Sequence, residues 1–237
     1  MARLICVMGE SGSGKTTSLR NLDPERTYIV DCDKKGLSWR GWRRQYNAEA
    51  RNYFVTDSTD RLLERERFLP SGGKETVPGL LDRIDAGETS HPIDVLVVDT
   101  LNGIMVADEA RRRGEDGYDK WADLAFAVWG LIDRASRMRD GLTVVFLAHS
   151  QTDRDEFGFV QTRIKTSGKK LDKIVLESKF PTVLYATRID GRHVFVTRAE
   201  HNTAKAPMGA LPEVMDNDIA EVIRLLDEYE NYEESEE

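Results

Sequence analysis

The chain has 237 residues, of which 40% are hydrophobic and 32% charged, a composition typical of a globular protein with one main domain and unlike that of disordered or fibrous proteins. The longest apolar run near the N-terminus, Leu4 to Met8, is far shorter than the roughly 20 residues that span a membrane, so we expect a cytoplasmic protein without a membrane partner. Two cysteines, Cys6 and Cys32, exclude a disulfide framework, and the lack of CxxC and HExxH spacings gives no support to a zinc site.

The net charge of −8 is unevenly distributed along the chain. Eleven acids and one base lie between Glu213 and Glu237, which leaves residues 1–212 with 33 bases and 31 acids, a net charge of +2. The overall negative charge therefore does not exclude a nucleic-acid partner. We expect one domain over residues 1–230 and an acidic, disordered tail over residues 231–237.

Strands alternate with helical stretches along the first two thirds of the chain, which predicts an α/β fold with a mostly parallel central sheet flanked by helices. The predicted strands are Leu4–Met8, Thr27–Asp31, Tyr53–Val55, Ile93–Asp99 and Leu142–Ala148. The predicted helices are Lys15–Leu22, Asp60–Leu69, Leu101–Arg113 and Tyr118–Arg139. The last helix places six apolar side chains on one face, which we assign to the core: Trp121, Leu124, Val128, Leu131, Ile132 and Ala135.

The last third of the chain has a different pattern. Residues 149–172 are polar and lack a clear period. Thr182–Ile189 and His193–Arg198 flank the sequence Asp190-Gly191-Arg192, which predicts a late β-hairpin. A final helix is predicted from Asp218 to Tyr229, with Asp218 and Glu221 at the spacing of a capping box.

The strongest motif is a phosphate-binding loop of the form GxxxxGK[ST], which directly follows a predicted strand and opens a predicted helix. Its glycines let backbone N–H groups turn toward phosphates, and the start of the helix adds a partial positive charge. We expect Lys15 at the β and γ phosphates of ATP and the Thr16 hydroxyl on Mg²⁺. The residues predicted to bind ATP or ADP are Gly9, Glu10, Ser11, Gly12, Ser13, Gly14, Lys15, Thr16 and Thr17.

Asp99 ends an apolar strand and is the second predicted magnesium residue. At the carboxyl edge of a parallel sheet, where ligands bind in such folds, its carboxylate would orient the metal as a Walker-B aspartate. The alternative is an aspartate that only caps the following helix.

Two other strand ends deliver polar side chains to the same edge. Asp33 follows the strand Thr27–Asp31 and is expected to activate the attacking water; the alternative is a solvated loop acid or a helix cap beside Lys34 and Lys35. His149 follows the strand Leu142–Ala148 and is expected to sense the γ phosphate, or else to be an ordinary histidine at a strand end.

A basic segment follows His149 and could track the backbone of single-stranded DNA. Phe157 and Phe159 lie just upstream and could stack on bases. The alternative is a solvated loop or a subunit contact. The basic residues expected to bind DNA are Arg163, Lys165, Lys169 and Lys170.

Five segments together resemble phage-encoded RecA-like ATPases, in particular the Sak-type single-strand annealing proteins of the AAA-type ATPase family: GESGSGKTT, LVVDT, FLAHSQ, KTSGKKLDK and HNTAKAP. The resemblance extends over roughly Leu4 to Tyr229. It implies a RecA-like P-loop core that binds ATP with Mg²⁺, binds single-stranded DNA and assists phage recombination as a homo-oligomer, either a ring or a filament. It also implies a place in the host cytoplasm and a single-strand-binding protein as a further partner.

The resemblance assigns two more roles. Asp33 stands where RecA-like ATPases place a glutamate, and its side chain is one methylene shorter, so we expect slow hydrolysis that DNA or oligomerisation stimulates. Lys205 would reach ATP bound by a neighbouring subunit. The expected catalytic set is therefore Lys15, Asp33, Asp99, His149 and Lys205. Two other functions fit the same loop: a nucleotide-dependent switch with little hydrolysis, and a small-molecule kinase.

Overall fold

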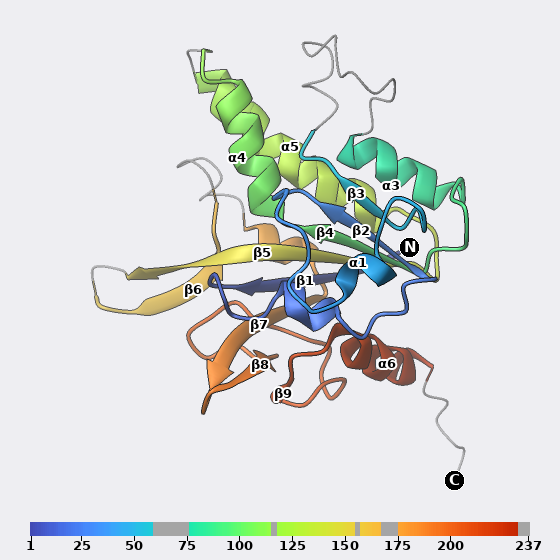
Figure 1. The fold of residues 1–237 in the computed structure, drawn as a ribbon. Coiled ribbons are helices and arrows are strands. Elements are labelled where there is room, and N and C mark those ends of the chain that lie inside the picture. Colours follow the sequence, from blue (N-terminus) through green and yellow to red (C-terminus); the bar gives the residue numbers. More distant parts are fainter. Residues whose placement is uncertain (59–75, 115–117, 155–156, 167–174, 232–237) are drawn as a thin grey trace.

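The computed structural model describes residues 1–58, 76–114, 118–154, 157–166 and 175–231. Within them, a nine-stranded sheet crosses the molecule and helices cover both of its faces (Figure 1). The predicted helix Asp60–Leu69 and most of the predicted tail lie outside the described residues. None of the described helices combines the length and hydropathy that would be needed to cross a membrane.

The sheet has the order β3-β2-β4-β5-β1-β7-β8-β9, and the strands from β3 to β7 in this order run parallel. The prediction of a mostly parallel α/β sheet is therefore confirmed. Strands β8 and β9 are antiparallel additions beyond β7, and β6 pairs antiparallel with β5. The strands are β1 (Arg3–Gly9), β2 (Thr27–Asp31), β3 (Tyr53–Val55), β4 (Val95–Asp99), β5 (Thr143–Arg154), β6 (Val160–Ile164), β7 (Thr182–Ile189), β8 (Arg192–Val196) and β9 (Val214–Asp216).

The strand register determines which side chains meet at the carboxyl edge of the sheet. Gly9 at the end of β1 lies opposite His149 on β5, and Asp31 at the end of β2 lies opposite Asp99 at the end of β4. The ends of β1, β2 and β4 and the middle of β5 therefore meet along one edge.

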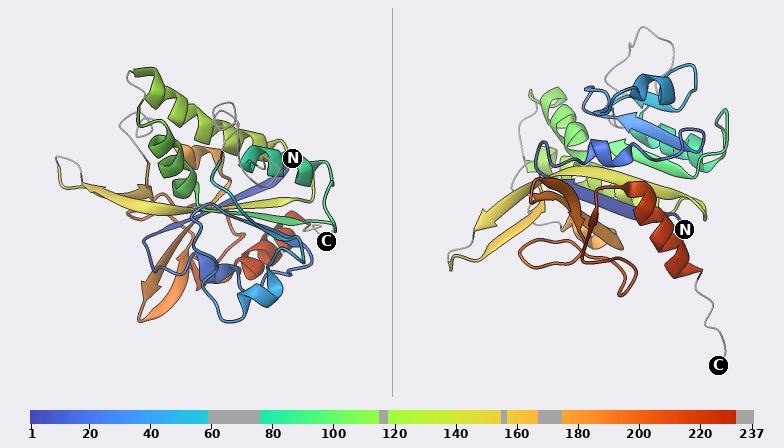
Figure 2. Two further views of the ribbon diagram at one scale, coloured as in Figure 1. Left: turned by 45° about the horizontal axis from the view of Figure 1, so that its top comes forward. Right: turned by 60° about the horizontal axis from the view of Figure 1, so that its bottom comes forward.

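The sheet lies between helices on its two faces (Figure 2), and a layer of buried apolar side chains packs on each face. Alternate residues of β1 enter different layers, as in a strand that is buried on both faces: Cys6 packs with one layer and Val7 with the other. One layer contains side chains of α3 (Val77–Asp85), α4 (Leu101–Arg111) and α5 (Tyr118–Ser136). The other contains side chains of the 3-10 helix η1 (Thr16–Leu19), of α1 (Trp42–Gln45) and of α6 (Ile219–Glu230).

Several local predictions are confirmed in detail. Val128, Leu131, Ile132 and Ala135 of α5 are buried as predicted, whereas the side chains of Trp121 and Leu124 lie outside the described part of the structure. Both cysteines are buried and neither forms a disulfide.

The predicted late hairpin forms between β7 and β8. Its two-residue turn consists of Asp190 and Gly191, whose φ angles of 50° and 79° are those of a type I′ turn. Helix α6 begins after Asp218, whose carboxylate accepts a hydrogen bond from the backbone N–H of Ala220. Glu221 bonds to Arg224 on the same helix, so only the N-cap half of the predicted capping box is present in the described contacts.

The prediction of a helix over Lys15–Leu22 is wrong in extent, because the chain forms only the four-residue 3-10 helix η1. The Ser18 hydroxyl donates to the carbonyl of Lys15, and hydroxyl side chains compete in this way with regular helical bonds. Pro24 also disfavours helical geometry at the residue before it. Since η1 is so short, its macrodipole is weak, and the predicted phosphate binding would depend on the loop N–H groups and Lys15 instead.

The prediction of an irregular segment after His149 is also wrong for the described residues. Strand β5 continues to Arg154 and returns as β6, with Ser150 opposite Ile164. The outer part of this hairpin leaves the core, so most of its residues there are polar or exposed and the sequence shows no hydrophobic period. Elements that the sequence did not reveal are α1, α3 and β9.

Candidate active site

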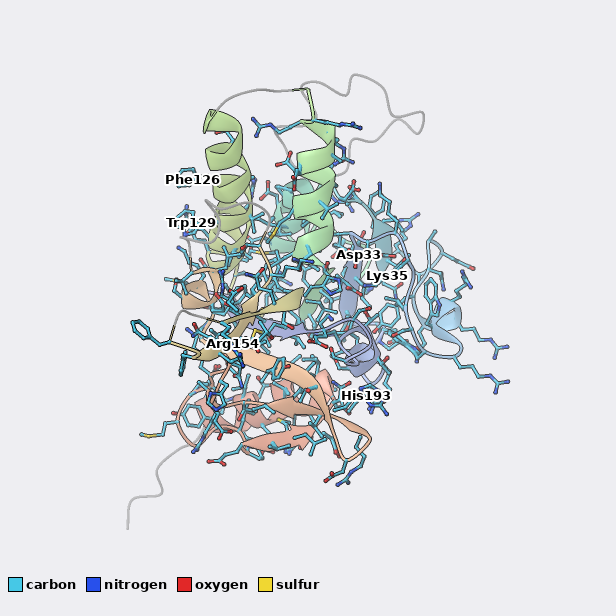
Figure 3. All side chains as sticks on the ribbon, turned by 90° about the vertical axis from the view of Figure 1, so that its left-hand side faces the viewer. Asp33, Lys35, Phe126, Trp129, Arg154 and His193 are labelled. Carbon is cyan, nitrogen blue, oxygen red and sulfur yellow. The ribbon has the colours of Figure 1, made fainter. Side chains whose placement is uncertain are left out.

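A cavity of about 240 Å³ opens at the carboxyl edge of the sheet, where β1 passes into the predicted phosphate-binding loop. This is the edge at which ligands bind in parallel α/β sheets. Figure 3 shows Asp33 and Lys35 side by side, with His193 below them in that view. The cavity is lined by Ser11, Gly12, Gly14, Lys15, Thr16, Thr17, Lys35, Ser38, His149 and His193.

The loop needs its glycines for two different reasons. Gly12 and Gly14 have φ angles of 79° and 98°, which side chains with a Cβ rarely adopt. At Gly9 the limit is space, because a Cβ would lie 2.5 Å from the carbonyl oxygen of Ala186 on β7. Nδ1 of His193 lies 3.0 Å from the carbonyl oxygen of Ser13, a distance at which the ring N–H donates to the loop. The late hairpin therefore supports the loop from the side opposite β5.

Lys15 is buried, with 6% of its surface exposed. Its Nζ donates to the carbonyl oxygens of Gly9 and Glu10, both at 2.8 Å. Burial lowers the pKa of Lys15 to about 8, and the nearby charge of Lys35 acts in the same direction. An ammonium that is desolvated in this way gains more from an incoming anion than a solvated one does.

Thr16 and Asp99 meet across the same site. The Thr16 hydroxyl donates to Oδ2 of Asp99 at 2.8 Å, and only 1% of Asp99 is exposed. Burial raises the pKa of Asp99, against the opposing effects of Lys35 and Thr16. The residue that caps α4 is Thr100, whose hydroxyl accepts from the N–H of Gly103 at 3.1 Å, so the alternative of Asp99 as a helix cap is wrong.

Lys35 connects Asp99 to Asp33. Its Nζ lies 2.7 Å from Oδ2 of Asp33 and 3.0 Å from Oδ1 of Asp99. Burial opposes the charge of Lys35, but its two carboxylate partners raise its pKa overall. The second oxygen of Asp33 accepts from the Thr100 hydroxyl at 3.1 Å, so Asp33 is not the solvated acid of the alternative interpretation.

Asp31 holds the turn that carries Asp33 and Lys35. One of its oxygens accepts from the Tyr53 hydroxyl and from the N–H of Gly36, both at 2.7 Å, and the other accepts from the N–H of Asp33 at 3.1 Å. Asp31, the last residue of β2, is therefore structural, and it holds the turn that places Asp33 beside Lys35.

His149 lies between the loop cavity and a neighbouring cavity of about 360 Å³ that Asp33 and Asn102 also line. Burial lowers the pKa of His149, and the charge of Lys15 adds to this effect, so the ring is neutral at pH 7. The Asn102 amide joins two segments here: its oxygen accepts from the N–H of His149 at 2.7 Å and its nitrogen donates to the carbonyl of Lys165 at 2.8 Å. A helix side chain thus connects the cavity to the end of the β5–β6 hairpin.

The residues predicted to bind DNA lie on or beside this hairpin. Lys165 follows β6 and is exposed, whereas Nε of Arg163 forms an ion pair with Asp153 at 2.6 Å. Lys169 and Lys170 are outside the described residues. Phe157 and Phe159 are 89% and 56% exposed at the turn side of the hairpin. Figure 3 shows Arg154 of the same hairpin well away from Asp33 and Lys35.

Lys205 is separate from the cavity of its own chain. Its side chain is exposed and its backbone pairs with Val183 at the start of β7, with N···O distances of 2.7 and 2.8 Å. Sequence reasoning missed three residues that the structure brings to the site: Lys35, His193 and Asn102. The only signal for Lys35 was its position after two closely spaced acids, and nothing in the sequence pattern connects His193 with the loop.

No curated protein matches the sequence. A family model described as an AAA domain matches residues 1–208, which include the loop, β4 with Asp99 and the β7–β8 hairpin. The chain therefore belongs to the AAA domain family of nucleotide-binding P-loop ATPases.

Proposed function

We propose that this chain is a magnesium-dependent ATPase that binds single-stranded DNA and assists phage recombination or strand annealing. The observation that carries the ATPase proposal is a bonded group of side chains: Lys15, Thr16 and Lys35 line one cavity, Thr16 bonds to Asp99, and Lys35 bonds to both Asp99 and Asp33. The family supports nucleotide binding, and the DNA and recombination parts rest on the hairpin and on the resemblance to Sak-type proteins.

The residues at the cavity fit ATP with Mg²⁺. The loop has no room for a Cβ at Gly9. The buried hydroxyl of Ser13 has no hydrogen-bond partner in the described structure, and Lys15 is buried beside the loop carbonyls. These are features of a site that is completed by a phosphate group. Thr16 and Asp99 offer the hard oxygen donors that Mg²⁺ prefers.

Each residue then has a defined task in hydrolysis. Magnesium-bound ATP supplies a polarised γ phosphate that water can attack. Lys15 binds the phosphate oxygens, Thr16 and Asp99 hold the metal, and Asp33 accepts a proton from the attacking water. His149, neutral at pH 7, offers one ring nitrogen as donor and the other as acceptor, which suits a residue that distinguishes the presence of a γ phosphate.

We propose that Lys205 completes the site of a neighbouring subunit. Its exposed side chain and its separation from its own cavity support a role in trans. The test is complementation. Lys15→Met and Lys205→Ala should each lose most ATP turnover alone, and a mixture should recover part of it, because the Lys15→Met chain supplies Lys205 to the intact loop of the other. Turnover by Lys205→Ala at the normal rate would contradict the role.

The DNA part is tested at the β5–β6 hairpin. The double variant Phe157→Ala, Phe159→Ala should weaken binding of single-stranded DNA by about 1–3 kcal/mol for each stacked base while leaving the salt dependence unchanged. Lys165→Ala should instead lower the slope of log affinity against log salt by about 0.7. Arg163→Ala should also weaken DNA binding, because it removes a basic residue that is expected to bind DNA and leaves the carboxylate of Asp153 without this partner. If neither the double variant nor Lys165→Ala weakens binding, the hairpin is not the DNA site.

The primary experiment measures ATP turnover with Mg²⁺ over a series of protein concentrations, with and without single-stranded DNA. Turnover that rises steeply with protein concentration and with DNA is the expected result. Lys15→Met should abolish both nucleotide binding and turnover, and unchanged turnover in that variant would refute the assignment of the site.

One observation favours a second function, a nucleotide-dependent switch with little hydrolysis. Both oxygens of Asp33 are held, by Lys35 and by Thr100, so this carboxylate has limited capacity left to accept a proton from water. Tight ATP binding without turnover, under all protein and DNA concentrations, would select the switch over the ATPase.

A further inference from the structure

Asp33 and Asp99 are two carboxylates that share one ammonium, and the sharing places a positive charge inside the candidate active site. Asp99 is almost fully buried and Asp33 is 18% exposed, so neither charge is compensated by water alone. Each carboxylate has one oxygen on Lys35, and the other oxygen accepts from a threonine hydroxyl. Lys35 is therefore the charged partner that the two acids have in common.

The same lysine belongs to the wall of the loop cavity, next to Lys15 and Thr16. Its ammonium sits 3.0 Å from Asp99, the carboxylate that we assign to the metal, and the Thr16 hydroxyl is 2.8 Å from the other oxygen of Asp99. A divalent cation that engages Thr16 and Asp99 must therefore settle close to the Lys35 ammonium. Two cations on one buried carboxylate repel each other.

We infer that Lys35 is a built-in counter-cation, which neutralises Asp33 and Asp99 while no metal is bound and competes with Mg²⁺ for Asp99. This inference rests on the proposed nucleotide site. It makes Lys35 a positioning residue with two linked effects. Without Mg²⁺, Lys35 screens the phosphates of a nucleotide from the two carboxylates. With Mg²⁺, it weakens the hold of Asp99 on the metal.

Both effects act in the same direction on one measurable quantity, the ratio of nucleotide dissociation constants without and with Mg²⁺. Removing the ammonium exposes the phosphates to two uncompensated carboxylates in the absence of metal, and frees Asp99 for the metal in its presence. The ratio should therefore rise in Lys35→Met by about tenfold or more, since one unit charge at a few ångströms changes binding by at least this factor.

The neighbouring lysine is a matched control. Lys34 pairs with Asp57 at 2.8 Å and is not part of the loop cavity, so Lys34→Met removes the same charge one residue away. We expect its ratio to stay close to that of the parent chain. Lys35→Arg keeps the charge and should restore most of the parent ratio.

The experiment titrates the full chain and its variants with a fluorescent, non-hydrolysable ATP analogue, once with excess MgCl₂ and once with EDTA. A purely structural role for Lys35 would raise both dissociation constants equally and leave the ratio unchanged, which would overturn the inference. So would an equal rise in Lys34→Met. Failure of the parent chain to bind the analogue under either condition would instead overturn the proposed function itself.

A second variant keeps the test valid if Lys35→Met folds poorly. In the double variant Asp33→Asn, Lys35→Met, one carboxylate loses its charge together with the lysine, which removes most of the imbalance. Its ratio should fall back toward the parent value. A ratio in this double variant that is tenfold or more above the parent value would contradict the charge argument.

Discussion

Lys15 should make the stability of the folded chain depend on pH. Burial is the main cause that lowers the pKa of its ammonium from 10.5 to about 8, and 6% of the residue is exposed. In the unfolded chain the pKa of Lys15 keeps its ordinary value. Between pH 8 and pH 10.5 the unfolded chain therefore binds more protons than the folded chain, and the free energy of unfolding rises with pH across that interval. At about 1.4 kcal/mol for each tenfold change in proton affinity, the folded chain is penalised by about 3 kcal/mol below pH 8.

The variant Lys15→Met isolates this effect. It keeps a long side chain but cannot titrate, so a difference between the two chains in the pH dependence of stability comes from the Lys15 ammonium together with its hydrogen bonds to Gly9 and Glu10. Urea unfolding, followed by far-UV circular dichroism in EDTA without nucleotide, gives the free energy of unfolding of both chains. Between about pH 7 and pH 10 the parent chain should gain about 2 kcal/mol relative to the variant.

One result of this measurement would contradict the prediction. If the difference between the two chains stays constant from neutral to alkaline pH, then Lys15 is not desolvated in the folded chain and the argument for its affinity toward phosphate loses its basis. The urea dependence of both chains must have the same slope at each pH, because a changed slope would indicate a different unfolded state and not a proton effect.

Four further variants test the loop, the core and a helix end. Gly9→Ala places a Cβ 2.5 Å from the Ala186 carbonyl oxygen, so it should destabilise the folded chain by about 1–3 kcal/mol and impair binding of the ATP analogue. In Gly12→Ala the new Cβ meets no atom within 4 Å, so this variant should lose only about 1 kcal/mol because of the positive φ. Equal losses of stability in urea unfolding would contradict the steric argument. Phe146→Ala removes a fully buried ring that packs edge-on against Phe180 and should cost about 3–5 kcal/mol in the same assay. Asp218→Ala removes the N-cap of α6 and should cost about 1 kcal/mol, and an unchanged melting temperature would show that the cap is dispensable.

The sequence was most informative where a local pattern has one physical meaning. The apolar runs that end in Asp31 and Asp99 became buried parallel strands, and Asp190-Gly191 formed the turn that its φ angles require. The GxxxxGK[ST] spacing located the cavity, because backbone turns of this kind depend on glycines at fixed positions. In these cases residues that are close in sequence determine the local structure by themselves.

The sequence was least informative where side chains meet only after folding. Lys35 follows the predicted acid Asp33 by two residues, but its second partner, Asp99, is 64 residues away. His193 reaches the loop across 180 residues of sequence. The length of η1 was overestimated because hydroxyl groups near Ser18 compete for backbone carbonyls, which a hydrophobic period does not reveal.

Strand β5 is continuous from the buried core through His149 to Arg154. At about 3.3 Å per residue, its outer five residues extend roughly 17 Å beyond the phosphate cavity, with no loop to absorb a change in direction. Thermodynamic linkage between two binding sites is reciprocal. If a molecule bound in the cavity raises the affinity of the hairpin for a second molecule by some factor, the second molecule raises the affinity of the cavity for the first by the same factor. If the proposed nucleotide site is coupled to the hairpin, a molecule that touches only the hairpin also changes the affinity of that site for nucleotide.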